Sequence, residues 1–120
     1  MIRIFCLASL CWIVSPALAR EAKQDARIAA LISAVENMQG GQFIRDGQAH
    51  DAKAAADHLR LKLKNAGNRV QTAEQFIEYC ASKSSTTGQK YRIRTTKGAE
   101  MDAAEFFKQK LKEFDEKEKS

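Results

Sequence analysis

The stretch Gln42–Leu63, QFIRDGQAHDAKAAADHLRLKL, decides the fold because an extended segment, a turn and an amphipathic helix follow one another within it. Its first four residues are too few for a helical repeat, and they include the strand-favouring Phe43 and Ile44. Asp46-Gly47 then supplies a turn that tolerates positive φ. The sequence therefore predicts a short strand that bends directly into a helix.

The helix of this stretch carries its apolar residues on one narrow stripe at helical spacing. The stripe consists of Ala52, Ala55, Ala56, Leu59 and Leu63. Asp51 or His50 stands near the N-cap position. Leu61 projects to the opposite side, so we expect a central helix that contacts structure on two faces. The alternative is an exposed leucine offered to a partner.

Two further helices are expected on either side of this stretch. Apolar residues at three- and four-residue spacing predict a helix from Glu21 to Met38, which Gly40-Gly41 ends. A capping box predicts the start of another helix, because the Thr72 hydroxyl can accept from the Gln75 amide while the Gln75 side chain reaches back. A hydroxyl-rich turn follows that helix.

A second strand and a last helix complete the expected fold. From position 91 to 95, large and β-branched residues alternate with two arginines, which is the period of a strand with one covered face. Two strands alone are marginal in water, so Phe43–Arg45 and Tyr91–Arg94 should pair and be covered by helices. The last helix starts near Asp102. We predict a helix-dominated α+β fold in the order α-β-α-α-β-α, with a small two-stranded sheet packed by about four helices.

The first 19 residues have the pattern of a secretory signal peptide. The apolar run Ile4–Val14 is too short to span a bilayer, and the small residues before position 20 predict cleavage after Ala19. Acylation of Cys11 is disfavoured because the bulky Leu10 precedes it; a short membrane anchor is the other alternative. Residues 20–114 should then form a single small domain, and residues 115–120 a charged tail that frays because nothing in it is apolar.

Removal of the signal peptide leaves Cys80 as the one cysteine of the mature chain, which therefore has no internal disulfide. Cys80 shares a helical stripe with Phe76. This position favours a small buried hydrophobic residue over a reactive thiol or an intermolecular bridge.

Positive charge is concentrated in the middle of the chain. Residues 60–97 contain nine basic and two acidic side chains, whereas the flanking parts of the mature chain are slightly acidic. The basic residues are Arg60, Lys62, Lys64, Arg69, Lys83, Lys90, Arg92, Arg94 and Lys97. Such a segment attracts anionic partners, and export argues against nucleic acid. The alternative is a solvated basic face that only keeps the protein soluble.

Several motifs in the same order and spacing resemble the YfeK-like family of small exported bacterial proteins of unknown function. They are Phe43–Gly47 with His50, His58–Leu63, Thr72–Ile77, Ala81-Ser82, and Ser84–Gly88 with Tyr91. The resemblance covers roughly Ala22–Ile93, and Asp46 departs from it because an Asn is expected there. It implies a periplasmic location and no assigned activity, so no functional residue is carried over.

Polar residues at the ends of apolar elements form a candidate site for an anionic group. The candidate binding residues are Arg45, Asp46, His50, Arg60, Ser84, Ser85, Thr87 and Arg92. If the two strands pair, the Asp46 turn and the hydroxyl-rich turn can meet at one end of the sheet, where arginines and hydroxyls donate and His50 adjusts the charge. The alternative is structural: a turn residue, helix caps and a surface ion pair.

No catalytic pattern is present: the sequence has no nucleophile elbow, no HExxH and no paired CxxC. His58 and Lys62 share a helix face without a third metal ligand, so we expect no metal, no cofactor and no catalytic residue. We predict a monomeric, non-catalytic binding module with a basic surface for an anionic envelope component. The alternative is a structural or inhibitory interaction protein of the periplasm that acts on a protein partner.

Overall fold

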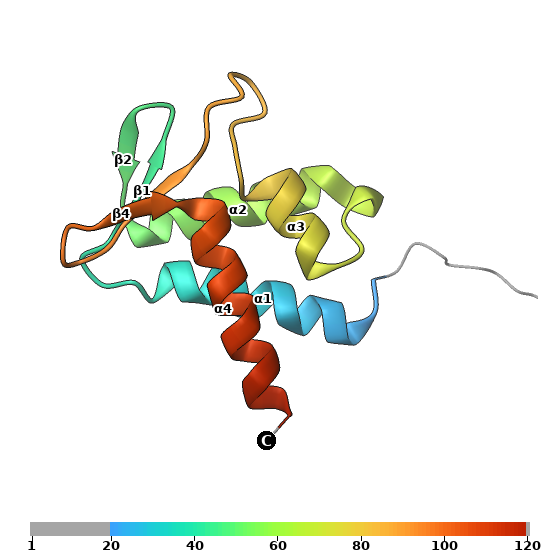
Figure 1. The fold of residues 1–120 in the computed structure, drawn as a ribbon. Coiled ribbons are helices and arrows are strands. Elements are labelled where there is room, and N and C mark those ends of the chain that lie inside the picture. The colour runs from blue at the N-terminus through green and yellow to red at the C-terminus, as the bar shows by residue number, and fades with distance from the viewer. Residues whose placement is uncertain (1–19, 120) are drawn as a thin grey trace, which may run out of the picture.

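The computed structural model describes residues 20–119 and builds them from four helices, a short 3₁₀ turn and four strands (Figure 1). The helices are α1 (Ala22–Glu36), α2 (Ala52–Ala66), α3 (Ala73–Cys80) and α4 (Ala103–Glu118), and Gly67–Arg69 forms the 3₁₀ turn η1. The strands are β1 (Gln42–Arg45), β2 (Gln48–His50), β3 (Arg92–Arg94) and β4 (Glu100–Asp102). The predicted signal peptide lies outside the described residues, so its cleavage stays a prediction.

The sheet is antiparallel, with the strands in the order β2-β1-β3-β4. Its centre confirms the predicted pairing, because Phe43 of β1 lies opposite Ile93 of β3. The number of strands was wrong: a short edge strand flanks each of the two expected ones. The helix-dominated α+β class is confirmed, and the sheet has four strands rather than two.

Helix α2 begins where the sequence predicts, and Asp51 rather than His50 is its N-cap. The Asp51 carboxylate accepts from the Ala54 N–H at 2.8 Å. The alanine-rich stripe is buried and packs against α1, where small side chains permit close approach. Helix α2 contacts α1, α3 and β1, so it does meet structure on more than one side, but Leu61 is 53% exposed and takes no part in these contacts.

Helix α3 starts with the predicted hydroxyl cap but with a different partner for Gln75. The Gln75 N–H donates to Thr72 Oγ1 at 3.1 Å, as a capping box requires. The Gln75 side-chain oxygen, however, accepts from the Gln71 N–H at 2.7 Å. Both donors lie at the helix start, so the cap still satisfies backbone groups that the helix itself leaves unpaired.

The core lies between the sheet and the helices and is rich in aromatic rings. Phe43 and Tyr91 pack with ring centroids 5.1 Å apart, and Phe76 contacts Phe107 edge to face at 6.4 Å. Cys80 is 1% exposed within this core, as its helical stripe predicts. None of the described helices is long and apolar enough to cross a membrane.

Helix α4 continues to Glu118, beyond the boundary predicted after Phe114, and its C-terminal half extends past α1 (Figure 1). An ion pair holds this part of the helix in place of apolar contacts. Arg27 on α1 is only 8% exposed and bonds Asp115 at 2.9 Å and Glu74 on α3 at 2.8 Å. One guanidinium thus joins three helices, and the hydrogen bonds from Glu74 and Asp115 raise its pKa.

Candidate functional site

The Asp46 turn and the hydroxyl loop, Ser82–Gly88, do meet at one end of the sheet. The Thr87 hydroxyl donates to Asp46 Oδ1 at 2.6 Å. Asp46 adopts a positive φ of 51°, which Asp tolerates better than most residues, and Gly47 follows with φ 81°. The turn thereby presents its carboxylate to the hydroxyl loop.

Ser84 shapes the hydroxyl loop from within. Its side-chain oxygen accepts from the N–H groups of Thr86 and Thr87, each at 3.2 Å, and its own N–H donates to the Gln89 carbonyl at 2.9 Å. Ser84 is buried, whereas Ser85 is exposed. Ser84 therefore has a structural role in this loop, which was the alternative to ligand binding.

Arg60 and Arg92, the two distant arginines of the candidate set, already hold carboxylates of the same chain. Arg60 Nη2 lies 2.6 Å from Glu36, and its hydrogen bond lowers the pKa of that carboxyl. Arg92 Nη1 lies 2.6 Å from Asp102, with Glu100 at 3.3 Å. The charges of both arginines are matched within the protein.

A different set of side chains converges beside the Asp46 turn, and we name it the basic cluster: Arg45, His58, Lys62 and Tyr91. Arg45 Nη1 and the Tyr91 hydroxyl each lie 3.5 Å from His58 Nε2. Lys62 Nζ donates to the Tyr91 hydroxyl at 3.0 Å and to the Lys83 carbonyl at 3.2 Å. The cluster draws on β1, α2 and the residue that leads into β3.

The elements of the fold fix these four positions. Pairing of β1 with β3 places Arg45 near the segment that contains Tyr91. His58 and Lys62 are one helical turn apart on α2, so they share the face that approaches the sheet. Tyr91 is only 2% exposed, and its ring packs on Phe43 while its hydroxyl faces the two side chains of α2.

The electrostatics of the cluster keep His58 neutral. Burial, and then the charges of Arg45, Lys62 and His50, lower the pKa of His58 to about 4. A neutral His58 has one lone pair at Nε2 and can accept there from Arg45 or from Tyr91, while Tyr91 in turn accepts from Lys62.

Among the residues that the structure describes, no carboxylate pairs with Arg45 or Lys62. Lys62 lies 4.9 Å from the centroid of the Tyr91 ring, so its charge is met only by that ring, a hydroxyl and a carbonyl. Asp46, the nearest carboxylate that acts on His58, is bonded to Thr87. The site therefore carries two half-buried positive charges without a counter-charge.

Sequence reasoning found part of this cluster and missed the rest. Arg45 was in the candidate set, whereas Tyr91 was assigned to a strand, and Lys62 was noted on one helix face with His58 but not as a binding residue. The available signal was the four-residue spacing of His58 and Lys62 on a helix next to a predicted strand pair. Within residues 20–119, no group of three or more His, Cys, Asp or Glu could hold a metal ion.

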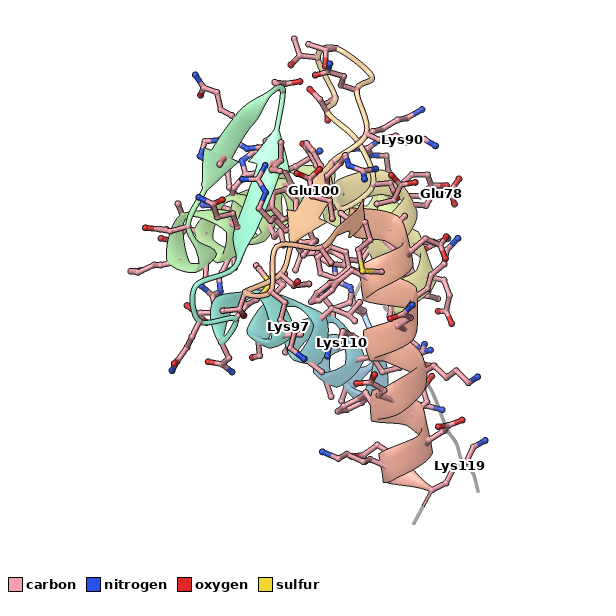
Figure 2. All side chains as sticks on the ribbon, turned by 60° about the vertical axis from the view of Figure 1, so that its left-hand side comes forward. Glu78, Lys90, Lys97, Glu100, Lys110 and Lys119 are labelled. Atoms are coloured by element: carbon pink, nitrogen blue, oxygen red, sulfur yellow. The ribbon has the colours of Figure 1, made fainter. Side chains whose placement is uncertain are left out.

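The remaining basic residues lie at several places, although Lys83 and Lys90 pair in an isolated bridge next to Lys62. Lys90 and Lys97 lie at opposite ends of β3, and Lys119 stands at the far end of α4 (Figure 2). A groove of about 700 Å³ between α3 and α4 mixes lysines with carboxylates, and its apolar floor is almost fully buried. The basic cluster is thus better suited than this groove to select one sign of charge.

Comparison with known proteins assigns relatives but no activity. The model of a family of unknown function, DUF5329, matches residues 22–115, a range that contains the whole basic cluster. The uncharacterized protein YfeK of Salmonella typhimurium (strain LT2) is 44% identical over 92 residues, which are 76% of this chain and 77% of that protein. No solved structure matches the chain.

Proposed function

The chain belongs to DUF5329, a family of unknown function, and is YfeK-like, so its function has to be argued from its own geometry; we propose that it is a non-catalytic module that binds an anionic component of the bacterial envelope. In this proposal the first 19 residues direct export and are removed, and the mature protein works in the periplasm. The observation that carries the proposal is the pair of cations, Arg45 and Lys62, that have no carboxylate partner among the described residues.

Half-buried cations without a carboxylate partner point to an external ligand, because a protein can easily supply counter-charges from its own side chains. Arg60, Arg92 and Arg94 of this same chain each contact a carboxylate within 2.7 Å. Arg45 and Lys62 instead face neutral groups, which repay less of the desolvation of a charge. An external anion would complete them with charge-assisted hydrogen bonds, which are about twice as strong as neutral ones.

The proposal is for binding rather than catalysis because the cluster offers donors without a reactive arrangement. The Tyr91 hydroxyl is buried and bonded to Lys62, and His58 is held neutral between two cations. In this proposal Asp46, Ser84 and Thr87 do not bind the ligand directly. They hold the hydroxyl loop in place beside the cluster.

Retention on purified anionic envelope material, such as lipopolysaccharide, tests the proposed function. The wild-type protein should be retained at low salt and released as salt rises, because exposed charges are screened over about 10 Å at 0.1 M. Arg45→Gln and Lys62→Gln should each weaken retention about tenfold, equivalent to one charge-assisted hydrogen bond.

Arg60→Gln is the matched control because it removes the same charge from an arginine that already has a partner, Glu36. It should change retention less than twofold. Equal losses in Arg60→Gln and Arg45→Gln would mean that net charge alone acts, and absent retention of the wild type would remove the proposal.

The alternative is an interaction protein of the periplasm that acts on a protein partner. It is favoured by the hydroxyl loop, which projects from the body of the molecule (Figure 1) and exposes every residue from Ser85 to Lys90. A partner of this kind would appear at fixed stoichiometry in a crosslinking pull-down from native periplasm. Its capture would survive Lys62→Gln and high salt.

A further inference from the structure

We propose that the basic cluster binds a phosphoryl group in preference to a carboxylate, and that His58 takes up a proton when this group is bound. The inference rests on the proposed function, for which it names the ligand class and a control by pH. It is carried by the charge of the cluster and by the directions from which its donors come.

The charge of the cluster matches a dianion. Arg45 and Lys62 are basic side chains, and neither pairs with a described carboxylate. A phosphomonoester carries between about −1.5 and −2 at pH 7, so one such group neutralises both cations. A carboxylate carries a single charge and would leave one cation unmatched.

The geometry of the cluster also favours a tetrahedral ligand. Its donors come from three elements: Arg45 from β1, Lys62 from α2, and the Tyr91 hydroxyl from the segment before β3. Arg45 and Tyr91 each lie 3.5 Å from His58 Nε2, and Lys62 lies 3.0 Å from the Tyr91 hydroxyl. A phosphoryl group presents three acceptor oxygens in different directions, whereas a carboxylate presents two in one plane.

His58 couples the site to pH because burial, and then the charges around it, keep it neutral. It faces Arg45 and Asp46 on one side of the cluster, His50 on β2, and Lys62 on its own helix, with the Tyr91 hydroxyl at 3.5 Å. The two cations help to lower the pKa of His58, and Asp46 opposes them. A bound dianion would offset the cations, so that protonation of His58 becomes favourable and supplies a further donor.

Thermodynamic reciprocity then fixes the direction of the pH effect. If anion binding raises the pKa of His58, protonation of His58 must tighten anion binding by the same factor. The affinity should therefore rise as the pH falls toward the pKa of His58 in the free protein, about 4. For a dianion that keeps its charge in this range, mild acid would load the site and neutral pH would favour release; a phosphomonoester loses part of its charge below about pH 6, which opposes this effect.

Titration with sulfate, followed by NMR of the histidine rings, tests the inference. Sulfate is a tetrahedral dianion that does not titrate in this range, so any pH dependence belongs to the protein. At constant ionic strength, sulfate should raise the pKa of His58 by about 1 and bind about fivefold more tightly at pH 4 than at pH 7. Acetate, the carboxylate probe, titrates in this range itself, so its ionised form is held at the sulfate concentration at each pH; it should then raise this pKa by less than half as much.

Three variants make the titration decisive. Lys62→Gln should lose the response to sulfate, and Arg60→Gln should keep it. His58→Gln should lose the pH dependence of sulfate binding, at whatever affinity the variant retains at pH 7. An effect of acetate equal to that of sulfate, or a His58 pKa that sulfate leaves unchanged in the folded wild-type protein, would overturn the inference.

Competition separates failure of this inference from failure of the proposed function. If envelope retention depends on Arg45 and Lys62 but acetate displaces the protein and inorganic phosphate does not, the phosphoryl preference is wrong and the proposed function stands. If retention does not depend on these residues, both are wrong.

Vesicles distinguish the two sources of a phosphoryl group. A lipid headgroup is indicated if the protein binds phosphatidylcholine vesicles only when they contain phosphatidic acid and phosphate competes weakly. A soluble ligand is indicated if inorganic phosphate displaces the protein.

Discussion

His58 should make the folded protein sensitive to mild acid. Its pKa is about 4 in the fold, below the ordinary value of 6.5, so the unfolded chain binds a proton at a higher pH than the folded chain does. The stabilisation is complete above pH 6.5 and is lost as the pH falls toward 4. Urea unfolding of the wild type should therefore show a lower midpoint at pH 5 than at pH 7, whereas His58→Gln should show a smaller difference.

The other histidine supplies the control for this experiment. His50→Gln removes a histidine from edge strand β2 and leaves His58 in place, so it should keep most of the acid sensitivity. The comparison belongs above pH 5, because paired carboxylates such as Glu74 and Glu100, whose pKa values are lowered, lose their own stabilisation at more acid pH. A His58→Gln protein as acid-sensitive as the wild type would show that His58 is not the responsible group.

Individual polar residues were predicted best where a local rule determines their role. Asp51 and Thr72 precede helices and bond the backbone three residues ahead, which their spacing alone indicates. Arg60 fulfils the ion-pair alternative with Glu36. Tyr91 was missed because its hydroxyl meets Lys62 across 29 positions of sequence, and no local rule reports such a contact.

At the scale of secondary structure, the last turns of α4 should contribute to stability although they bury little apolar surface. Asp115 bonds the nearly buried Arg27, so deletion of residues 115–120 leaves that guanidinium with Glu74 as its one ion-pair partner within the described chain. The loss should be about 1 kcal/mol, because a hydrogen bond to a charged, partly exposed group is worth about that much. In thermal unfolding this corresponds to a Tm lower by about 5 °C.

Deletion of residues 117–120 is the control, since it shortens the same helix and keeps Asp115. It should change the Tm by less than half as much. Equal effects of the two deletions would assign the loss to helix length, and no effect of either would support the predicted fraying after Phe114.

The helices were predictable because their apolar residues repeat at helical spacing, and side-chain caps mark the starts of α2 and α3. The central strands were predictable because large or β-branched residues mark both of them. The edge strands β2 and β4 were not, since each has only three residues, none of them buried. Such strands form because the neighbouring strand offers backbone hydrogen bonds. This cause lies in the tertiary structure, so the sequence of the edge strand shows no alternating pattern.

For the molecule as a whole, the position of the basic cluster follows from topology. Strand β1 and helix α2 are neighbours in sequence, but Tyr91 reaches them only because β3 returns to pair with β1. The composition predicted a positively charged segment, yet most of its charges are dispersed or paired within the protein. The fold, rather than net charge, leaves Arg45 and Lys62 without a carboxylate partner among the described residues.

Cys80 should report the opening of the whole core. Its side chain is 1% exposed, and burial raises the pKa of its thiol, so both access and thiolate formation are suppressed in the native state. Labelling by a thiol reagent should be at least about a hundredfold slower in the native protein than in urea, because it requires the packed helices to separate. Cys80 is the one cysteine of residues 20–120, so a reductant should leave the Tm of the processed protein unchanged.

Two variants test whether labelling of Cys80 depends on opening of the core. Phe107→Ala removes a ring from the same core and should speed labelling by destabilising the fold, whereas the surface variant Lys53→Ala should not. Rapid labelling of the native wild type would instead identify Cys80 as an accessible, reactive thiol.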